Sequence, residues 1–498
     1  MYSSNSPRRA KLREPLLPAN ETSSAACKLE EEDGGSKGIS VAQAVYNVVN
    51  VYVGLGLLSK PYAIAEGGCI SVFALALLCT VANVTGKLIV RGFAKLPAKD
   101  RTYAGLGEKA FGAPGKWLVL SVVTLEFAGA LMVVLIFVWK NALLLAPWYL
   151  PDAFISVGTV AVVTTLAATP TVWALDFAAL AGIGLLGVVA SALIVGVLAL
   201  VACYSAAKVL FAGTPAPQFE LPLVGQGLPV AVGIFVLSLG GHAALPGVFA
   251  SMAEPHRFDR MLDISIAAMF IIYASVGLAG WITYGWLKGQ YVDVLITTNM
   301  AHDTSGGIVP LTLPGHWGAR RMSLESTIMT LAVVAKSFTA ISPVTAVLAD
   351  LPEMLILGTQ ARPPRTATAA TATPTTRQRT KRITTLTPTL TSGKPSDMAH
   401  ELARHQRQQR ILRTVLLWLV AAAAYPCAMY PHGLALVEAV TGAMCSMLAS
   451  LALPCACWVA VYRDEIPRSQ AFAAIAIAVV AAIGGAVFTT VDIIQLGT

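Results

Sequence analysis

Eleven apolar stretches dominate this sequence, and each of them is long enough to cross a lipid bilayer. They lie at roughly 41–64, 69–92, 117–139, 154–172, 177–204, 228–252, 264–287, 327–349, 411–430, 433–461 and 471–494. A bilayer core about 30 Å thick needs about 20 helical residues, and lipid-facing backbone must satisfy its hydrogen bonds within a helix or a closed barrel. None of the stretches alternates apolar and polar residues as a strand would. The sequence therefore predicts an all-α polytopic membrane protein with eleven transmembrane helices.

The composition supports a chain that is dissolved in lipid. Of the 498 residues, 56% are hydrophobic and 12% are charged, with a mean hydropathy of +0.67. Globular domains carry about a quarter charged residues, so a soluble fold would leave large apolar areas facing water. The eight cysteines show no zinc-ligand spacing, and we expect them to be reduced core residues. We therefore expect neither a bound metal nor a cofactor.

Polar composition marks two segments outside the membrane. Residues 1–40 and 350–410 are rich in Lys, Arg, Thr, Pro or acidic residues and cannot bury a core, so we predict disordered cytosolic segments there. The remaining chain then divides into helices 1–8 over 41–349 and helices 9–11 over 411–495. The tail and this basic loop are the two longest polar segments of the sequence.

Basic residues predict the orientation of the chain. With a cytosolic N-terminus, the tail and the cytosolic loops hold 28 lysines and arginines, and the opposite side holds five. Loops with excess positive charge stay in the cytosol during insertion. The net charge of +8 is thus explained by topology, with the lipid bilayer as partner, and we expect no binding to nucleic acid.

Glycine and proline interrupt the first and sixth apolar stretches in their middles. The first reads VNVYVGLGLLSKPYAIAEGG and the sixth reads VGIFVLSLGGHAALPGVF. Glycine makes unwinding cheaper and proline cannot donate the helical hydrogen bond. Non-helical backbone at membrane depth is tolerated where it lines a cavity. Breaks five helices apart favour a five-plus-five inverted repeat with an eleventh helix added, although each break alone could be an ordinary kink.

The two breaks give the candidate substrate site, because exposed half-helix ends can bind carboxylate and amine groups. We assign to it the residues of the two breaks and the polar groups near them: Asn50, Gly54, Gly56, Ser59, Tyr62, Gly240, Gly241, Pro246, Thr339 and Ser342. For Asn50 the simpler alternative is a backbone cap.

Lys60, Glu126, His242 and Lys336 are the main ionisable residues deep inside the apolar stretches, where charge is costly and often functional. His242 and Glu126 are the candidates for proton coupling, because histidine titrates near neutral pH and a buried carboxyl can do so. Lys60 and Lys336 are candidate charge partners. A structural histidine and a structural ion pair remain the alternatives for His242 and Glu126.

Longer motifs resemble one known family. SVAQAVYNVVNVYVGLGLLSKPYAIAEGG, YAGLGEKAFGAPGK, TVWALDFAALAGIG and GLPVAVGIFVLSLGGHAALPGVFASMAEPHRF are similar to the amino acid/auxin permease family, particularly its vacuolar and vesicular inhibitory amino acid transporter-like branch. The resemblance covers most of 40–495 apart from the loops. It implies eleven helices and proton-coupled carriage of amino acids or related amines, often in vacuolar, lysosomal or vesicular membranes. Lys60 departs from the family pattern, which has a small or apolar residue there.

These features together predict a secondary active transporter of amino acids. No nucleotide site, metal cluster or nucleophile–base pair is recognisable, so we expect no enzyme, and the energy must come from an ion or substrate gradient. We predict proton coupling and alternating access in a multi-pass protein of the vacuolar membrane, with protons and small amino acids as partners. A plasma-membrane importer of amino acids or amines, and a nutrient sensor signalling through its cytosolic loop, are the alternatives.

Overall fold

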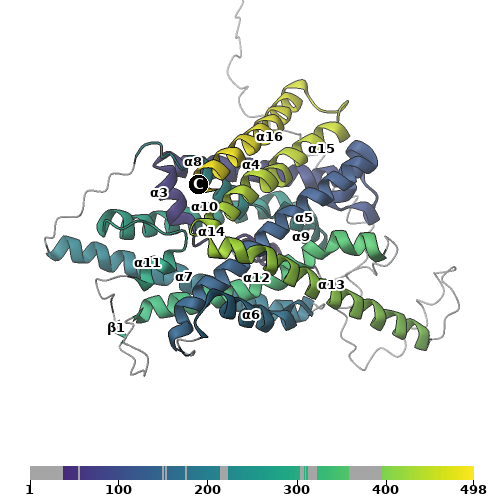
Figure 1. Cartoon of the computed structure of the whole chain (residues 1–498). Helices are drawn as coiled ribbons and strands as arrows, with labels where there is room; N and C mark the ends of the chain where they lie inside the picture. Colours follow the sequence, from purple (N-terminus) through teal and green to yellow (C-terminus); the bar gives the residue numbers. More distant parts are fainter. Residues whose placement is uncertain are drawn as a thin grey trace, which may run out of the picture.

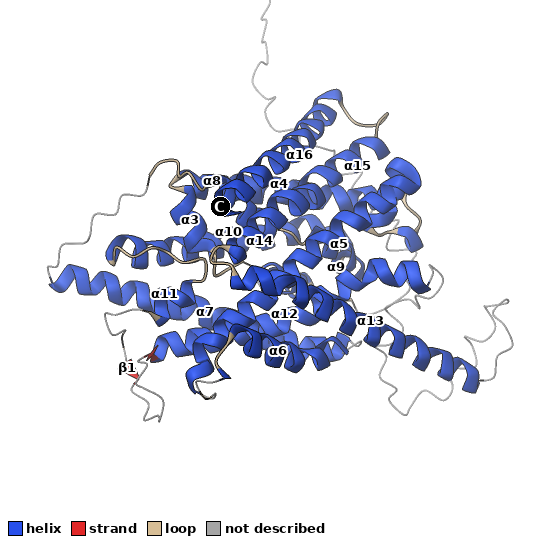
Figure 2. Cartoon of the chain, viewed as in Figure 1, coloured by secondary structure: helices blue, strands red, loops and turns tan. Residues whose placement is uncertain are grey.

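The computed structural model describes residues 38–53, 56–148, 151, 154–173, 177–212, 222–302, 308, 310–311, 322–357 and 395–497. Almost all of this part is helical (Figure 2). Its only strands are β1 (Pro310–Leu311) and β2 (Met322–Ser323), a short antiparallel pair. The prediction of an all-helical membrane fold is confirmed.

Nine helices of the described part are long and apolar enough to cross a membrane. The first and fourth predicted crossings are not among them. The first is split into α2 (Val41–Tyr52) and α3 (Lys60–Gly67), and the 12 residues of α2 rise only about 18 Å. The fourth, 17 residues long, consists of α6 (Val157–Ala168) and the 3-10 helix η5 (Thr169–Trp173). The count of eleven and the inverted repeat stay predictions.

The breaks of the first and sixth stretches lie where glycine and proline predict them. Helix α2 begins at a capping box, in which Ser40 and Gln43 bond each other's backbone N–H. The sixth stretch contains α8 (Leu228–Ser238), the 3-10 turn η6 (His242–Ala244) and α9 (Leu245–Ser251). Each of these stretches is therefore two short helices joined by non-helical backbone.

The remaining elements of the described part include seven helices much longer than these short ones (Figure 1). The remaining elements are α4 (Ile70–Gly92), η1 (Phe93–Lys95), η2 (Ala98–Asp100), α5 (Tyr103–Leu145), η3 (Ala146–Trp148), α7 (Phe177–Ala212), η7 (Pro255–Arg257), α10 (Phe258–Gly280), the π-helix η8 (Trp281–Leu287), α11 (Ile296–Ala301), α12 (Leu324–Leu357), α13 (Pro395–Met429), α14 (Gly433–Val440), the π-helix η10 (Thr441–Ala452), α15 (Leu453–Val461) and α16 (Arg468–Gly497).

The predicted loop at 350–410 is too wide at both ends. Helix α12 continues to Leu357, and α13 already begins at Pro395 and projects from the bundle (Figure 1). The segment HELARHQRQQR favours helix because Ala, Leu, Arg and Gln are strong helix formers even where the side chains are too polar for lipid. The rest of that loop, and residues 1–37 of the predicted tail, lie outside the described residues.

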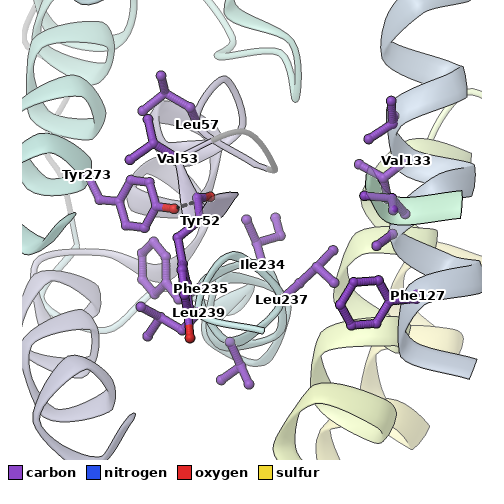
Figure 3. Close-up of a cluster of buried hydrophobic side chains, with 14 of the residues drawn as sticks. Tyr52, Val53, Leu57, Phe127, Val133, Ile234, Phe235, Leu237, Leu239 and Tyr273 are labelled. Carbon is purple, nitrogen blue, oxygen red and sulfur yellow. Dashed lines mark hydrogen bonds between the residues drawn. The ribbon is translucent and has the colours of Figure 1, made fainter. Parts of the chain in front are cut away.

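Of the broken helices, α3 and α8 are mostly buried inside the bundle, whereas α2 and α9 each have an exposed side. Tyr52, Val53 and Leu57 of the first stretch pack against α8, whose other side faces α5 (Figure 3). Helix α8 also crosses α14 and η10 at very short range: a Cβ at Gly442 would overlap the carbonyl of Gly233. Small residues at such crossings let two backbones touch. The sequence thus places glycine where the central helix needs close neighbours.

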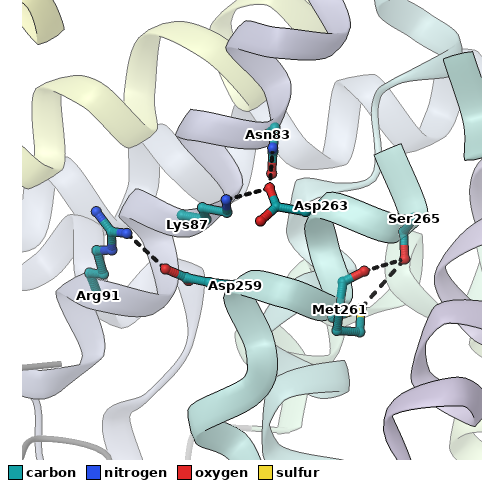
Figure 4. Close-up of polar contacts among 7 residues, drawn as sticks. All are labelled: Asn83, Lys87, Arg91, Asp259, Met261, Asp263 and Ser265. Atoms are coloured by element: carbon teal, nitrogen blue, oxygen red, sulfur yellow. Dashed lines mark hydrogen bonds and ion pairs between the residues drawn. The ribbon is translucent and has the colours of Figure 1, made fainter. Parts of the chain in front are cut away.

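Ion pairs join α4 to α10 at one end of the bundle. Asp263 accepts hydrogen bonds from Lys87 at 2.5 Å and Asn83 at 2.6 Å, and Arg91 pairs with Asp259 at 2.8 Å (Figure 4). The hydroxyl of Tyr462, just after α15, donates to the Arg91 carbonyl at 2.8 Å. Burial, together with nearby Glu465, raises the pKa of Tyr462 to about 12, so this hydroxyl keeps its proton.

Candidate functional site

The break of the first stretch packs directly onto α8. Gly56 has φ = 72°, in the left-handed region that favours glycine, and a Cβ there would overlap the Ser238 hydroxyl. Gly54 lies outside the described residues. Ser59 and Lys60 follow, and both are fully buried. The left-handed turn therefore directs two polar side chains into the middle of the bundle.

Lys60 connects α3 to the C-terminal end of α8. Its ammonium donates to the Ile234 carbonyl at 3.2 Å and to the Ser238 hydroxyl. It also lies 4.8 Å from the ring centroid of Tyr273 and 5.3 Å from that of Phe235. A cation next to helix C-terminal carbonyls and aromatic faces is stabilised by both. Lys60 thus holds the two broken helices together.

Glu438 of α14 is a site residue that the sequence prediction missed. The Ser59 hydroxyl donates to its Oε1 at 3.0 Å, and the carboxylate interacts electrostatically with Lys60. Glu438 is fully buried. The signal was present, because Glu438 is an acid inside an apolar stretch, as Glu126 is. The same criterion applied to every stretch would have found it.

Glu126 and Ser446 flank the break of the sixth stretch. A Cβ built on Gly240 would lie 2.5 Å from Glu126 Oε1 and 2.9 Å from Ser446 Oγ. Glu126 is 1% exposed and forms no ion pair within the described part of the chain. The carboxylate on α5 therefore directly borders non-helical backbone of the candidate site.

The two breaks also meet through two tyrosines. A Cβ at Gly241 would overlap the ring of Tyr52, the last residue of α2. The hydroxyl of Tyr273 lies 2.7 Å from the Tyr52 carbonyl (Figure 3). It also lies 3.1 Å from the Ser238 carbonyl, so one proton is shared between the ends of α2 and α8. Helix ends leave such carbonyls without partners, and Tyr273 satisfies both.

His242 is anchored on α4. Its Nε2 lies 3.0 Å from the Thr85 hydroxyl and 3.1 Å from the Ala82 carbonyl. A carbonyl can only accept, so Nε2 carries a proton when it bonds Ala82. The histidine is 1% exposed. These contacts fit the structural role that the sequence left open, and they also couple the sixth stretch to α4.

Lys336 and Asn50 form a second polar contact away from Lys60. The Lys336 ammonium donates to Asn50 Oδ1 at 2.6 Å and to the Asn50 carbonyl at 3.2 Å. Thr339, one turn further along α12, donates to the Lys336 carbonyl at 2.6 Å. The predicted residues Asn50, Thr339 and Lys336 are therefore brought together, although as an internal contact between α2 and α12.

Three further predicted residues have other surroundings. Tyr62 packs edge-on against Tyr291 with ring centroids 6.4 Å apart. It lies two residues after Lys60 on α3, so the two side chains point to opposite sides of the helix. Pro246 is buried in the first turn of α9. Ser342 is buried on α12, and its hydroxyl makes no hydrogen bond to any described residue.

Solved structures with a similar fold are transporters. A substrate-bound, outward-open Na+-coupled sialic acid symporter matches with a TM-score of 0.50 at 12% identity, over 96% of this chain and 94% of that one. The manganese transporter of Eremococcus coleocola matches with a TM-score of 0.51 at 11% identity, over 92% and 89%. At such low identity these similarities establish the fold alone.

The curated proteins with similar sequences include amino acid transporters and a transporter of GABA. Amino acid transporter AVT1B of Arabidopsis thaliana is 31% identical over 66% of this chain and 58% of the relative. AVT1C of the same plant is 32% identical over 50% and 45%, and the vesicular GABA transporter of Caenorhabditis elegans is 26% identical over 53% of each chain. The match thus spans about half the length of these relatives.

The family model described as transmembrane amino acid transporter protein matches residues 37–314. That range contains both broken stretches and Glu126, and it is more than half of the chain. The predicted resemblance is confirmed, and the family and the relatives are transporters, as predicted, and not enzymes. This chain belongs to the transmembrane amino acid transporter family.

Proposed function

We propose that this protein is a secondary active transporter that moves amino acids by alternating access across the vacuolar membrane, using a proton gradient. The main support is the meeting of the two broken stretches in the centre of the bundle, with the buried Glu126 carboxylate beside Gly240. Proteins of this kind bind substrate where helices are interrupted, since interrupted backbone offers free donors and acceptors.

The helix ends at the breaks suit both groups of an amino acid. The carbonyl ends of α2 and α8 lie close together at Tyr52 and Ser238, where the Tyr273 hydroxyl bridges the two carbonyls. In this proposal a substrate amine binds at the second lone pair of these oxygens. Helix α3 begins at Lys60 and presents its N-terminal end to the same region, which favours a carboxylate. In this proposal, Gly56, Gly240 and Gly241 keep the backbone within reach of the substrate.

Proton coupling is assigned to Glu126 and His242. Glu126 borders the break directly, so its protonation changes the charge felt by a substrate there. His242 reaches α4 from the same break, so its protonation would alter the hydrogen bonds that hold η6. The vacuolar location rests on the branch of the family that the sequence motifs resemble.

Uptake into vesicles containing the purified full-length protein tests this proposal. Labelled amino acids are offered with and without an inward-acidic or outward-acidic pH gradient. We expect His242→Ala and Glu126→Gln each to reduce the stimulation by the gradient about tenfold, within the usual range for coupled binding. Thr124→Val, a change at a neighbouring hydroxyl on α5 that bonds only its own helix, is the control.

Different results separate the alternatives. Gradient-stimulated uptake that survives in Glu126→Gln but not in His242→Ala assigns the proton to the histidine, and the reverse assigns it to the glutamate. Binding of amino acids without uptake would instead favour the nutrient sensor. Fluorescent tagging of the whole protein in its own cells distinguishes the vacuolar from the plasma membrane.

A further inference from the structure

Lys336 is a buried cation whose partners are oxygen atoms of a single residue. The side chain is 5% exposed, and the ammonium donates to the side-chain oxygen and to the backbone carbonyl of Asn50. Lys60 has Glu438 nearby, whereas no described carboxylate interacts with Lys336. The charge must therefore be stabilised by dipoles.

The required dipole is the C-terminal end of α2. This helix stops at Tyr52, so the Asn50 carbonyl belongs to its last turn, where carbonyls lack intrahelical partners. The end of a helix carries about half a negative charge. A cation held by the terminal carbonyl and an amide oxygen is thus well placed electrostatically.

The contact lies where three helices meet. A Cβ at Gly187 of α7 would lie 2.7 Å from Thr339 Oγ1 and 3.4 Å from Asn50 Oδ1. Helix α12, which carries Lys336, packs along both α5 and α7. Helix α2, by contrast, is short and ends at a break. The ammonium therefore ties a short helix to the long helices beside it.

We propose that the Lys336 ammonium is a built-in cation that clamps α2 to α12, at a helix end of the type that binds the coupling ion in other broken-helix carriers. Lys336 is then a positioning residue, and the transport cycle needs no sodium ion at this helix end. The inference rests on the proposed transport function, but the clamp itself is measurable without transport.

The clamp is tested by the accessibility of α2 in the solubilised full-length protein. Ala44 of α2 is fully buried, so Ala44→Cys is labelled slowly by a water-soluble maleimide. Adding Lys336→Ala should speed this labelling about tenfold or more, as expected for losing a charged hydrogen bond. Asn50→Leu should do the same from the opposite partner, and Lys336→Arg should keep the slow rate. The same variants without Ala44→Cys give the background from native thiols.

Ethylammonium provides a rescue that a merely structural role would not show. In the Ala44→Cys, Lys336→Ala variant it should restore slow labelling, while tetramethylammonium, which cannot donate a hydrogen bond, should not. Lys140→Ala, at another partly buried lysine, is the control and should leave the rate unchanged. Labelling that stays slow in Lys336→Ala and in Asn50→Leu would overturn the clamp.

Replacing Na+ by choline tests whether the transport cycle needs no sodium ion at the end of α2. Uptake by the parent protein should agree within about twofold in the two salts, because an ion that binds no state preferentially shifts nothing. Strict dependence on Na+ would overturn the role as a built-in cation. If the parent protein takes up no amino acid while Lys336→Ala still speeds the labelling of Ala44→Cys, the clamp stands and only the proposed transport function is refuted.

Discussion

Charged residues inside the bundle differ in the groups that surround them. Lys60 has helix carbonyls, aromatic rings and Glu438, whereas Lys336 has the two oxygens of Asn50. Glu126 lies beside the backbone of Gly240. Lys60 and Glu438 are thus a buried pair of opposite charge, whereas Lys336 and Glu126 are buried without an ion-pair partner among the described residues.

The Ser59 hydroxyl should contribute more to the free energy of unfolding than an ordinary buried serine hydroxyl does, because it donates to a buried carboxylate. Ser59→Ala leaves Glu438 Oε1 without this donor, and we expect a loss of about 1–3 kcal/mol in the free energy of unfolding. Ser265→Ala is the matched control, since the buried Ser265 hydroxyl donates to the Met261 carbonyl of its own helix. Thermal unfolding in detergent measures both, and equal losses would contradict the expectation.

Bulk at Gly241 should disrupt the meeting of the two breaks. The sequence alone suggests that Gly241→Leu fills space for the ligand, but in the structure the first obstacle is the ring of Tyr52. We expect transport to fall at least about tenfold, since a small displacement of binding groups is costly. Gly247→Leu on α9, where nothing lies within 4 Å, should leave uptake unchanged. Normal uptake by Gly241→Leu would place the site elsewhere.

At the scale of elements, short helices need unusually close neighbours. Helix α8 has 11 residues and packs against α3, α14 and η10, so it lies in the interior where its few turns are held from several sides. The crossing of Gly233 and Gly442 is so tight that neither position has room for a side chain. The conformation of α8 is therefore set by its neighbours more than by its own length.

Substitution at this crossing should destabilise the packing of α8 against α14 and η10. Gly442→Ala places a methyl group against the backbone of Gly233, which cannot move aside as a flexible side chain could. We expect a destabilisation of about 1–3 kcal/mol or more, typical of overpacking. Gly484→Ala on α16 has nothing within 4 Å and serves as control. Melting temperatures of the two solubilised variants give the comparison, and identical values would argue against the close crossing.

At the scale of the whole molecule, helix number and charge asymmetry make one joint prediction. Eleven crossings would place the two chain ends on opposite sides of the membrane, and the basic residues place the N-terminus in the cytosol. Protease protection of a tag at each end in sealed vesicles is the measurement. We expect the N-terminal tag to be digested from the cytosolic side and the tag after Thr498 to be protected. Both tags on one side would contradict eleven crossings.

The sequence by itself determined that this is a membrane protein, where its helices break and to which family it belongs. Hydrophobicity acts locally and adds up over about 20 residues, so membrane helices can be read without knowing their neighbours. Glycine and proline act on their own backbone, so the breaks near Gly56 and Gly240 are also local.

Only the tertiary structure decided which polar groups meet. Ser59 and Glu438 are 379 positions apart, and Asn50 and Lys336 are 286 positions apart. A hydrogen bond requires a donor and an acceptor within about 3 Å, a distance that the packing of several helices sets together. Charge and polarity can be read along the chain, but a partner exists only in space.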